Sequence, residues 1–489
     1  MNKKFLINLS FLLLLNVLVK PFWIFGVERS VQNIVGASEF GFYFSLFNFS
    51  LLLNIILDFG ITNFNNRNIS QNHSILSKHL SNIISLRFLL AIVYAILSIS
   101  LALIIGYDKR QLLILGVLIF NQFLSSLTLY LRSNISGLQL FKTDSMLSVL
   151  DRLLMIIICS ILIWGNVTEQ QLKIEWFVLT QTAAYLLTAI TAFIIVLSKT
   201  SFFKLNFDYK FFRVFLKQSY PYALLLLLMA FYNRIDSVML ERMLPDGKAQ
   251  AGIYAQAFRI LEAASMFAYL FSVLLLPMFA RMIKKKESIE DLVKLSFTLI
   301  IVPAIILMSI CLFYNKEIMN LMYWEHVESS SVILSALIIG FLGICTTYIF
   351  GTLLTANGSL KYLNIMAACG MVLNIGLNII LIPKYNVLGA AVASMITQLA
   401  TGISQLIIAK NLFKFKTNIK LLASLAGFII LSILIAKFST KINFAWFLTA
   451  IGAAGVSLLF AFVTGMFNIK SIIKLIKKNR EITKSIDID

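Results

Sequence analysis

The chain has 489 residues, of which 59% are hydrophobic and 13% charged, and its mean hydropathy is +0.89. Soluble globular proteins contain about 45–50% apolar and about 25% charged residues, so this composition excludes a typical water-soluble enzyme. A net charge of +20 would suggest nucleic-acid binding in a soluble protein, but here the basic residues gather in short segments between apolar runs. With four cysteines in the whole chain, a secreted disulfide scaffold is excluded as well.

Apolar runs of about 18 residues or more, each long enough to cross a bilayer, recur along the whole chain. In chain order they predict fourteen transmembrane helices, near residues 5–26, 40–64, 82–106, 111–131, 146–165, 176–197, 218–240, 253–280, 292–314, 332–356, 363–383, 387–409, 419–436 and 443–467. The runs are continuous, unlike the short alternating strands of a membrane barrel. The predicted fold class is therefore an all-α polytopic membrane protein.

The basic residues predict the orientation in the membrane. With the N-terminus placed in the cytoplasm, cytoplasmic segments hold 27 of the 42 lysines and arginines and outer loops hold 10. This bias agrees with the positive-inside rule and places both termini in the cytoplasm. The tryptophans independently favour the same orientation, because all of them fall at outer helix ends: Trp23, Trp164, Trp176, Trp324 and Trp446.

An internal repeat relates two parts of the chain. Residues 36–43 and 247–254 both read G-x-x-x-x-G-x-Y, at an offset of 211 residues that carries helix 1 onto helix 7 and helix 2 onto helix 8. A shift of six helices preserves direction across the bilayer, so the two repeats are expected to be parallel. The glycines are expected to be turn positions with positive φ or points of close approach.

The repeat predicts how the chain is divided. Residues 1–197 form an N-terminal lobe of six helices, and 218–411 form a second lobe of six helices. Between them, 198–217 is an amphipathic basic linker, in which phenylalanines alternate with lysines as in a helix lying in the cytoplasmic membrane interface. Residues 412–467 form a final helix pair, and 468–489 form a basic cytoplasmic tail.

Three segments carry a resemblance to a known family. They are 374–394 (NIGLNIILIPKYNVLGAAVAS), 57–61 (LDFGI) and 236–240 (DSVML), the last followed by GIY at 252–254. Together with fourteen helices in two lobes plus a terminal pair, they resemble the polysaccharide transporters (Wzx-type O-antigen flippases) of the multidrug/oligosaccharidyl-lipid/polysaccharide exporter superfamily. The resemblance covers the whole chain.

The resemblance implies a MATE-like fold, with two lobes around a central cavity that opens alternately to either side of the bacterial inner membrane. It implies a flippase that moves undecaprenyl-diphosphate-linked oligosaccharide repeat units from the inner to the outer leaflet, for O-antigen, capsule or exopolysaccharide assembly. The implied partners are this lipid-linked glycan, membrane lipids and other membrane proteins of polysaccharide assembly, with no nucleic acid.

Five cations fall inside apolar runs, where each costs about 2.5–3.5 kcal/mol if it faces lipid. They are Lys20, Arg87, Arg152, Arg234 and Arg259. We expect them to line a wet cavity and to bind the diphosphate or sugar, since arginine pairs bidentately with phosphate and lysine acts as a point charge. Lys20, Arg234 and Arg259 are expected toward the outer side, and Arg87 and Arg152 toward the inner side, where snorkelling is the alternative for Arg87.

Four acids also fall inside apolar runs: Asp58, Asp151, Asp236 and Glu262. Such a carboxylate either carries a coupling ion, H⁺ or Na⁺, or balances a nearby cation. Charge balance is favoured for Asp58 and Asp151, and Asp236 stays open. Because Arg259 and Glu262 are three residues apart on one predicted helix, a local ion pair is expected there, as an alternative to substrate contact for Arg259.

No catalytic or metal-binding pattern is found in the sequence, so the protein is predicted not to be an enzyme and to need no cofactor beyond a coupling ion. Two other functions stay open. One is a multidrug or organic-cation exporter of the same superfamily, whose cavity would favour acidic residues. The other is a membrane-embedded polysaccharide polymerase or glycosyltransferase, although the longest outer loop, 315–331, shows no catalytic pattern.

Overall fold

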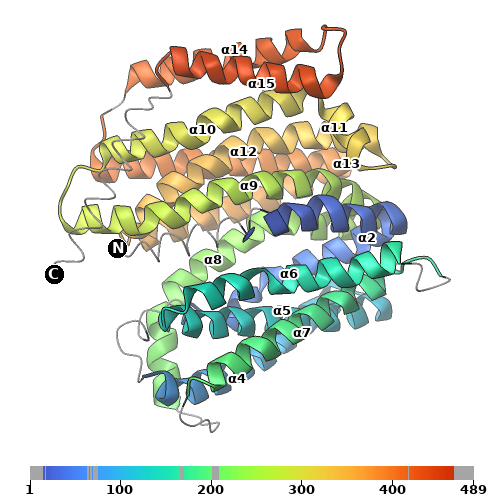
Figure 1. Ribbon diagram of the computed structural model, residues 1–489, viewed down its shortest axis with the longest axis vertical. Helices are drawn as coiled ribbons and strands as arrows, with labels where there is room; N and C mark the ends of the chain where they lie inside the picture. The colour runs from blue at the N-terminus through green and yellow to red at the C-terminus, as the bar shows by residue number, and fades with distance from the viewer. Residues whose placement is uncertain are drawn as a thin grey trace. The chain divides into compact units, whose positions relative to one another are not determined.

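Figure 1 shows the computed structural model, which describes residues 15–16, 18–62, 65, 69, 75–165, 170–200, 209–416 and 418–466. Regular structure in these residues is helical throughout, without a strand. The all-α fold class is therefore confirmed. Three predicted segments lie outside the described residues: the start of the first span up to residue 14, the middle of the linker at 201–208, and the basic tail 468–489.

The chain divides into two compact units. The first unit consists of Asn2–Glu241 and Asp246–Gly252, and the second unit consists of Arg242–Pro245 and Ile253–Asp489. The sequence predicts the boundary between lobes in the linker 198–217, whereas the two units divide one helix later.

Side-chain contacts explain this later boundary. Arg234, on the last long helix of the first unit, donates to Asn48 Oδ1 at 3.3 Å. At the end of the same helix, Glu241 accepts a hydrogen bond from Gln111 Nε2 at 2.8 Å, and both side chains are buried. A buried carboxylate without such a partner would cost free energy, so these contacts fix the helix to the bundle of the first unit.

The first unit contains helices that cover the predicted spans, and several of them are longer than the apolar runs by up to about ten residues. In chain order they are the π-helix η1 (Trp23–Glu28), α2 (Arg29–Leu52), the 3-10 helix η2 (Asn54–Leu57), α4 (Ile75–Ile105), α5 (Lys109–Gly137), α6 (Phe141–Trp164), α7 (Ile174–Leu197) and most of α8 (Tyr209–Met243). The start of α5 is fixed by a capping box, in which Asp108 and Gln111 each bond the other's backbone N–H. Large apolar side chains on α4, such as Ile96 and Ile104, are exposed as expected for a lipid-facing surface.

The repeated glycine motif has the geometry that the sequence predicts. Gly36 has a φ of 81°, which favours glycine, and it breaks α2 at a point between the predicted spans 5–26 and 40–64. A Cβ atom on Gly41 would overlap the backbone of Lys248 and Gly252, and one on Gly252 would overlap the carbonyl of Ala37. The second glycine of each copy of the motif thus lies at a point of close backbone approach, inside the first unit.

Aromatic stacking repeats with the same offset as the glycines. The rings of Tyr43 and Phe47 stack with centroids 5.7 Å apart and an interplanar angle of 27°. Those of Tyr254 and Phe258, each 211 residues further along the chain, stack at 5.6 Å and 23°. The local structure of the two motif copies is therefore alike beyond the glycines themselves.

Replacing Gly41 by alanine is expected to lower the free energy of unfolding by about 1–3 kcal/mol, because the new methyl group meets backbone that cannot rotate away. The measurement is the melting temperature of the purified protein in detergent. Gly116→Ala on α5 is the matched control, since a Cβ there meets no atom within 4 Å and alanine is the better helix former. Equal melting temperatures for the two variants would contradict the close packing at Gly41.

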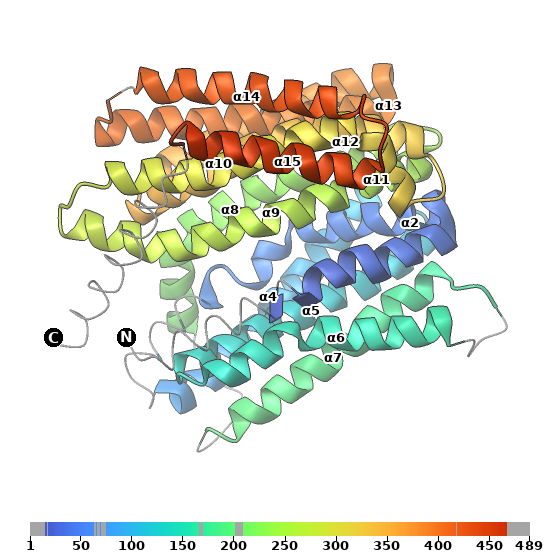
Figure 2. The same cartoon turned by 45° about the horizontal axis from the view of Figure 1, so that its top comes forward.

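The second unit holds the remaining helices. They are α9 (Gly247–Lys284, whose first turn belongs to the first unit), α10 (Glu290–Phe313), α11 (Asn315–Met322), α12 (Val327–Ala356), α13 (Leu360–Phe413), α14 (Ile419–Ser439) and α15 (Trp446–Val463). α12 packs closely on α13, where Gly343 approaches the backbone of Gln398 and lets the helices touch. The final pair α14 and α15 packs on α10 (Figure 2).

Among the described residues, eleven helices are long and apolar enough to cross a membrane. α13 has 54 residues, which at 1.5 Å per residue is about 80 Å and far exceeds a bilayer. Asn386, with a φ of 51°, divides it where the sequence predicts the separate spans 363–383 and 387–409. The spans predicted at 5–26 and 40–64 are not among the eleven. The multi-pass architecture is confirmed, and the number fourteen stays a prediction.

Candidate functional site

The first unit contains a cluster of basic side chains inside its helix bundle. Lys20, half-buried, lies just before Pro21, which has no backbone N–H to donate, and the helix widens into η1 two residues later. Its ammonium group interacts electrostatically with two cations, Arg152 and Arg132, and with one carboxylate, Asp151. π-Helical turns of this kind are frequently found at functional sites.

Arg152, on α6, is held beside Lys20 mainly by aromatic rings. Its guanidinium carbon lies 5.6 Å from the ring centroid of Trp23 and 5.9 Å from that of Tyr185. Arg152 Nε is 3.8 Å from Asp151 Oδ2, and Nη1 contacts Met155 Sδ at 3.4 Å. The side chain keeps 27% of its surface exposed, so it can still reach a ligand.

The sequence places Lys20 toward the outer side and Arg152 toward the inner side of the membrane. In the structure the two charges lie within range of electrostatic interaction, and their depths in a bilayer stay a prediction. The helix that carries Lys20 continues to the break at Gly36, about ten residues beyond the predicted end of its span. Lys20 is therefore nearer the middle of its helix than the hydropathy pattern suggests.

Arg132 differs from these two cations because it has a dedicated partner. Its Nε donates to Asp144 Oδ1 at 2.8 Å, with side chains 20% and 16% exposed. The predicted span 111–131 ends one residue before Arg132 and leaves it in a loop. In the structure, α5 continues to Gly137 and includes Arg132. Arg152 has longer-range carboxylate partners, with Asp151 Oδ2 at 3.8 Å from its Nε and Glu28 within electrostatic range, and Lys20 interacts with the same Asp151.

Arg87, on α4, is fully enclosed in protein, with 2% of its side chain exposed. Its guanidinium pairs with Asp58 and donates to the carbonyl oxygen of Ser126 at 2.9 Å, to the Ser126 hydroxyl at 2.8 Å and to the Thr62 hydroxyl at 2.9 Å. The Tyr130 ring centroid lies 4.8 Å from its Cζ. Snorkelling is therefore wrong for Arg87, and Asp58 balances a buried cation.

The other four predicted residues lie on α8 and α9. Arg234 donates to Asn48, as described above, and Asp236, two residues later, is 1% exposed. In the second unit, Arg259 Nη1 donates to Glu262 Oε2 at 2.6 Å, with side chains 6% and 22% exposed. The expected local ion pair on α9 is thus present. The structure groups Lys20 with Arg152, and it places Arg87 and Arg259 in ion pairs of their own.

A second group of charges was missed by sequence reasoning because its members lie at helix starts. Arg110 bridges Glu39 at 2.6 Å and Glu175 at 2.7 Å, with all three side chains between 36% and 45% exposed. They border a cavity of about 780 Å³. The residues lining it are Ile34, Val35, Glu39, Arg110, Gln170, Gln171, Leu172, Lys173, Ile174 and Glu175. Glu39, Arg110 and Glu175 each lie one residue before a predicted span, so the sequence places them in loops and does not predict their contact.

The chemistry of the basic cluster is that of anion binding. Lys20 and Arg152 supply donors that suit phosphate oxygens, and the neighbouring aromatic rings keep the guanidinium in place. Within the described part of the chain, three or more His, Cys, Asp or Glu side chains never gather as a metal site would require. The free cysteines lie on separate helices.

The sequence matches a known family. The family described as "Polysaccharide biosynthesis protein" matches residues 6–283, which is more than half of the chain. The capsular polysaccharide biosynthesis protein CapF of Staphylococcus aureus is 27% identical over 186 residues, and the match covers 37% of this chain and 45% of CapF. The chain therefore matches less than half the length of that relative.

Solved transporters have a similar fold. The lipid II flippase MurJ in an inward closed conformation has a TM-score of 0.72 at 16% identity, over 92% of this chain and 98% of that chain. An inward-facing multidrug resistance MATE family transporter of the MOP superfamily has a TM-score of 0.57 at 14% identity, over 84% and 98%. The MATE transporter VcmN of Vibrio cholerae, in a mutant form, has a TM-score of 0.58 at 15% identity, over 84% and 97%.

At these identities the likeness concerns the fold alone, and the family assignment depends on the sequence match. The matched region contains both copies of the glycine motif and the basic cluster of the first unit. The chain belongs to the polysaccharide biosynthesis protein family.

Proposed function

We propose that the protein is a flippase for undecaprenyl-diphosphate-linked oligosaccharide repeat units, moving them from the inner to the outer leaflet of the bacterial inner membrane by alternating access. The observation that carries the proposal is that Lys20 and Arg152 lie within range of electrostatic interaction inside an apolar bundle, with Arg152 over the ring of Trp23. Two like charges in a medium of low dielectric repel each other, and an anionic ligand removes that cost. A diphosphate supplies charge of the required sign and size.

The direction of transport follows from the orientation that we propose, with both termini in the cytoplasm. The excess of basic residues in the segments assigned to that side supports it, as do the tryptophans at the opposite helix ends. In this orientation the diphosphate would enter from the cytoplasm and meet Lys20 and Arg152, while the lipid tail stays in the bilayer. Arg234 on α8 is a further candidate ligand to the head group.

The organic-cation exporter is the weaker alternative, because three of the four intramembrane acids lie close to an arginine. Such a substrate needs a carboxylate that is accessible in the cavity, but Asp58 and Glu262 are each paired with an arginine. Asp151 lies beside Arg152. We propose Asp236, which is buried on α8, as the first carboxylate to test for coupling to H⁺ or Na⁺.

The test is lipid extraction from cells depleted of this protein, with leaflet-specific labelling of polyprenyl-linked sugars. Complete repeat units on their carrier, trapped facing the cytoplasm, are expected. Sensitivity to cationic drugs without any trapped glycan would replace the proposal with the exporter alternative. Single repeat units that accumulate on the outer face would instead indicate the polymerase alternative.

A further inference from the structure

The cavity of about 780 Å³ beside Arg110 lies in the first unit, where the helices α2, α5 and α7 pack on one another. It is lined by part of α2 around the break at Gly36, by the first turn of α5, and by the chain that enters α7. Sites for small molecules have volumes of about 300–1,000 Å³, so the cavity is large enough for one. In the orientation proposed above, these helix starts lie on the outer side of the membrane.

The charges that line this cavity cancel. They are two carboxylates, Glu39 and Glu175, and two cations, Arg110 and Lys173. Arg110 donates to Glu39 through Nη1 at 2.9 Å and Nη2 at 2.6 Å, and to Glu175 through Nε at 3.0 Å and Nη2 at 2.7 Å. This forked geometry holds the two carboxylates side by side. The cavity therefore has hydrogen-bonding groups in fixed positions without a net charge.

Packing fixes the Arg110 guanidinium as well. Its Cζ lies 4.6 Å from the ring centroid of Phe42, which is fully buried. The capping box of Asp108 and Gln111 fixes the first turn of α5, in which Arg110 lies. Groups that are held in place before a ligand arrives lose little entropy when it binds. The carboxylates attached to Arg110 are thus preorganised, and they stay partly exposed, so that a ligand can reach them.

The lining suits a ligand that both donates and accepts hydrogen bonds. Carboxylates accept, the Lys173 ammonium donates, and the amides of Gln170 and Gln171 do both. A diphosphate would be repelled by the two carboxylates, and an organic cation would find both of them already paired with Arg110. Sugar hydroxyls match such a neutral polar surface, and the apolar side chains of Leu172 and Ile174 can cover the C–H groups of a sugar ring.

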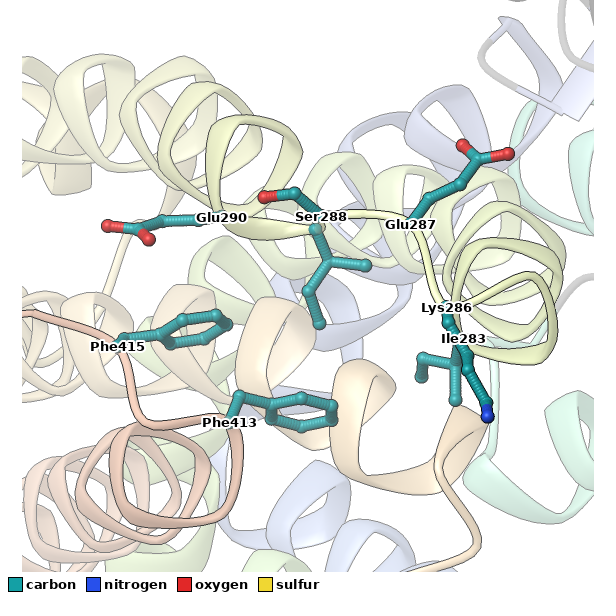
Figure 3. A pocket seen from close by; sticks show the side chains of 8 residues that line it. Ile283, Lys286, Glu287, Ser288, Glu290, Phe413 and Phe415 are labelled. Atoms are coloured by element: carbon teal, nitrogen blue, oxygen red, sulfur yellow. The ribbon is translucent and has the colours of Figure 1, made fainter.

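A smaller cavity, in the second unit, does not have this arrangement. It has a volume of about 290 Å³ and lies between the α9–α10 loop and the end of α13 (Figure 3). One lysine and two glutamates line it, together with two phenylalanines. Figure 3 shows the side chains of Lys286 and Glu287 pointing in opposite directions, so the polar groups there do not converge on one ligand.

We propose that the cavity beside Arg110 is a sugar site, which binds the uncharged part of the glycan at the outer side of the first unit. The inference rests on the proposed flippase function for its substrate class, but not on the basic cluster of Lys20 and Arg152. In this scheme the basic cluster binds the diphosphate, and Glu39, Glu175 and the glutamines bind sugar hydroxyls. Two separate sites would allow one substrate to be held at both its charged and its uncharged part.

The test measures binding of the free oligosaccharide, released by mild acid from the polyprenyl-linked glycan of the cells, to the full-length protein in detergent. Binding is expected, and Gln171→Ala with Glu175→Ala is expected to weaken it at least tenfold, because hydrogen bonds to a charged acceptor are lost. The matched control is Lys316→Gln with Glu328→Gln. This exposed pair lies in the second unit and outside the cavity, so the control should bind as the wild type does.

Inorganic pyrophosphate is the second probe, because it tests the diphosphate site alone. Lys20→Met with Arg152→Met should lose pyrophosphate and keep the oligosaccharide, whereas the double alanine variant should show the reverse. A protein that binds the oligosaccharide but not pyrophosphate would contradict the diphosphate assignment and support the sugar site.

Three results would overturn the sugar site. They are no binding of the oligosaccharide by the wild type, unchanged binding by the double alanine variant, and tighter binding of glycerophosphoethanolamine than of the oligosaccharide. The last of these would identify a zwitterionic lipid headgroup as the ligand. The melting temperature of each variant shows whether it is folded.

Discussion

Replacing Arg87 by alanine is expected to leave little folded protein, with a loss of about 3–5 kcal/mol in the free energy of unfolding. The substitution removes the cation that pairs with Asp58 and leaves the Ser126 and Thr62 oxygens without their donor. The Asp58 carboxylate, which is 28% exposed, loses its cation, and the space of an arginine side chain that is only 2% exposed is left unfilled. A loss of this size is a large fraction of the stability of a typical domain.

The measurement is the yield of monodisperse protein and its melting temperature in detergent. Arg110→Ala is the matched control, because Arg110 also pairs with carboxylates and also lies over an aromatic ring, 4.6 Å from the centroid of Phe42. Its side chain is 45% exposed, so its ion pairs are expected to contribute no more than about 1 kcal/mol. If both arginine variants lose stability equally, burial of Arg87 is not what makes it important.

A double substitution separates a structural role of Arg87 from a role in substrate binding. Replacing a buried pair by two apolar residues is often neutral for stability, so Arg87→Met with Asp58→Leu is expected to fold again. If Arg87 only balances Asp58, the double variant also transports. A folded double variant without transport would return Arg87 to the substrate site, as the sequence predicts.

The sequence predicts the helices well because the bilayer imposes a strong physical signal. Each helix must present about 20 apolar residues to lipid, so α6, α10 and α14 lie within a few residues of their predicted spans. The breaks at Gly36 and Asn386 also lie between predicted spans. Close approach at Gly41 and Gly252 could be expected as well, because only glycine leaves room for another backbone.

The sequence does not predict which charged side chains lie close together when they come from segments that are distant in the chain. Arg87 and Asp58 are 29 residues apart, and their pairing depends on how α4 packs beside the turn after η2. The distance between Lys20 and Arg152 along the chain is larger still, and the helix that carries Lys20 continues about ten residues beyond the end of its predicted span. The pair of Arg259 and Glu262 could be predicted since one helical turn brings the two residues together.

The intramembrane cations therefore divide according to what compensates their charge. Arg87 and Arg259 each have a carboxylate in direct contact. Lys20 interacts with two cations and one carboxylate, and Arg152 lies between two rings, 3.8 Å from Asp151 and within electrostatic range of Glu28. A group whose charge is already compensated gains little from a ligand, whereas a pair of like charges gains much. This difference, and not depth in the membrane, selects Lys20 and Arg152 as the residues on which transport is expected to depend.

Removing both charges, as Lys20→Met with Arg152→Met, is expected to reduce transport at least 100-fold. Hydrogen bonds to charged groups contribute about 1.5–3 kcal/mol each, and 1.4 kcal/mol corresponds to a factor of ten in binding. The measurement is export of the glycan in cells that carry only the variant, with the amount of protein in the membrane determined in parallel. Lys20→Arg with Arg152→Lys is the charge-preserving control, and it should retain most of the transport.

Loss of transport should not be accompanied by loss of stability when Lys20 is replaced. This result would distinguish a residue that binds substrate from a residue with a structural role. Because Lys20 is a half-buried cation with two further cations, Arg152 and Arg132, and one carboxylate within electrostatic range, Lys20→Met alone is expected to keep or raise the melting temperature of the purified protein while transport is lost. A structural ion pair would behave like Arg87, where loss of the cation lowers stability. A lower melting temperature for Lys20→Met, or full transport by the double methionine variant, would remove these two residues from the proposed diphosphate site and leave Arg234 as the cation of the first unit still to be tested.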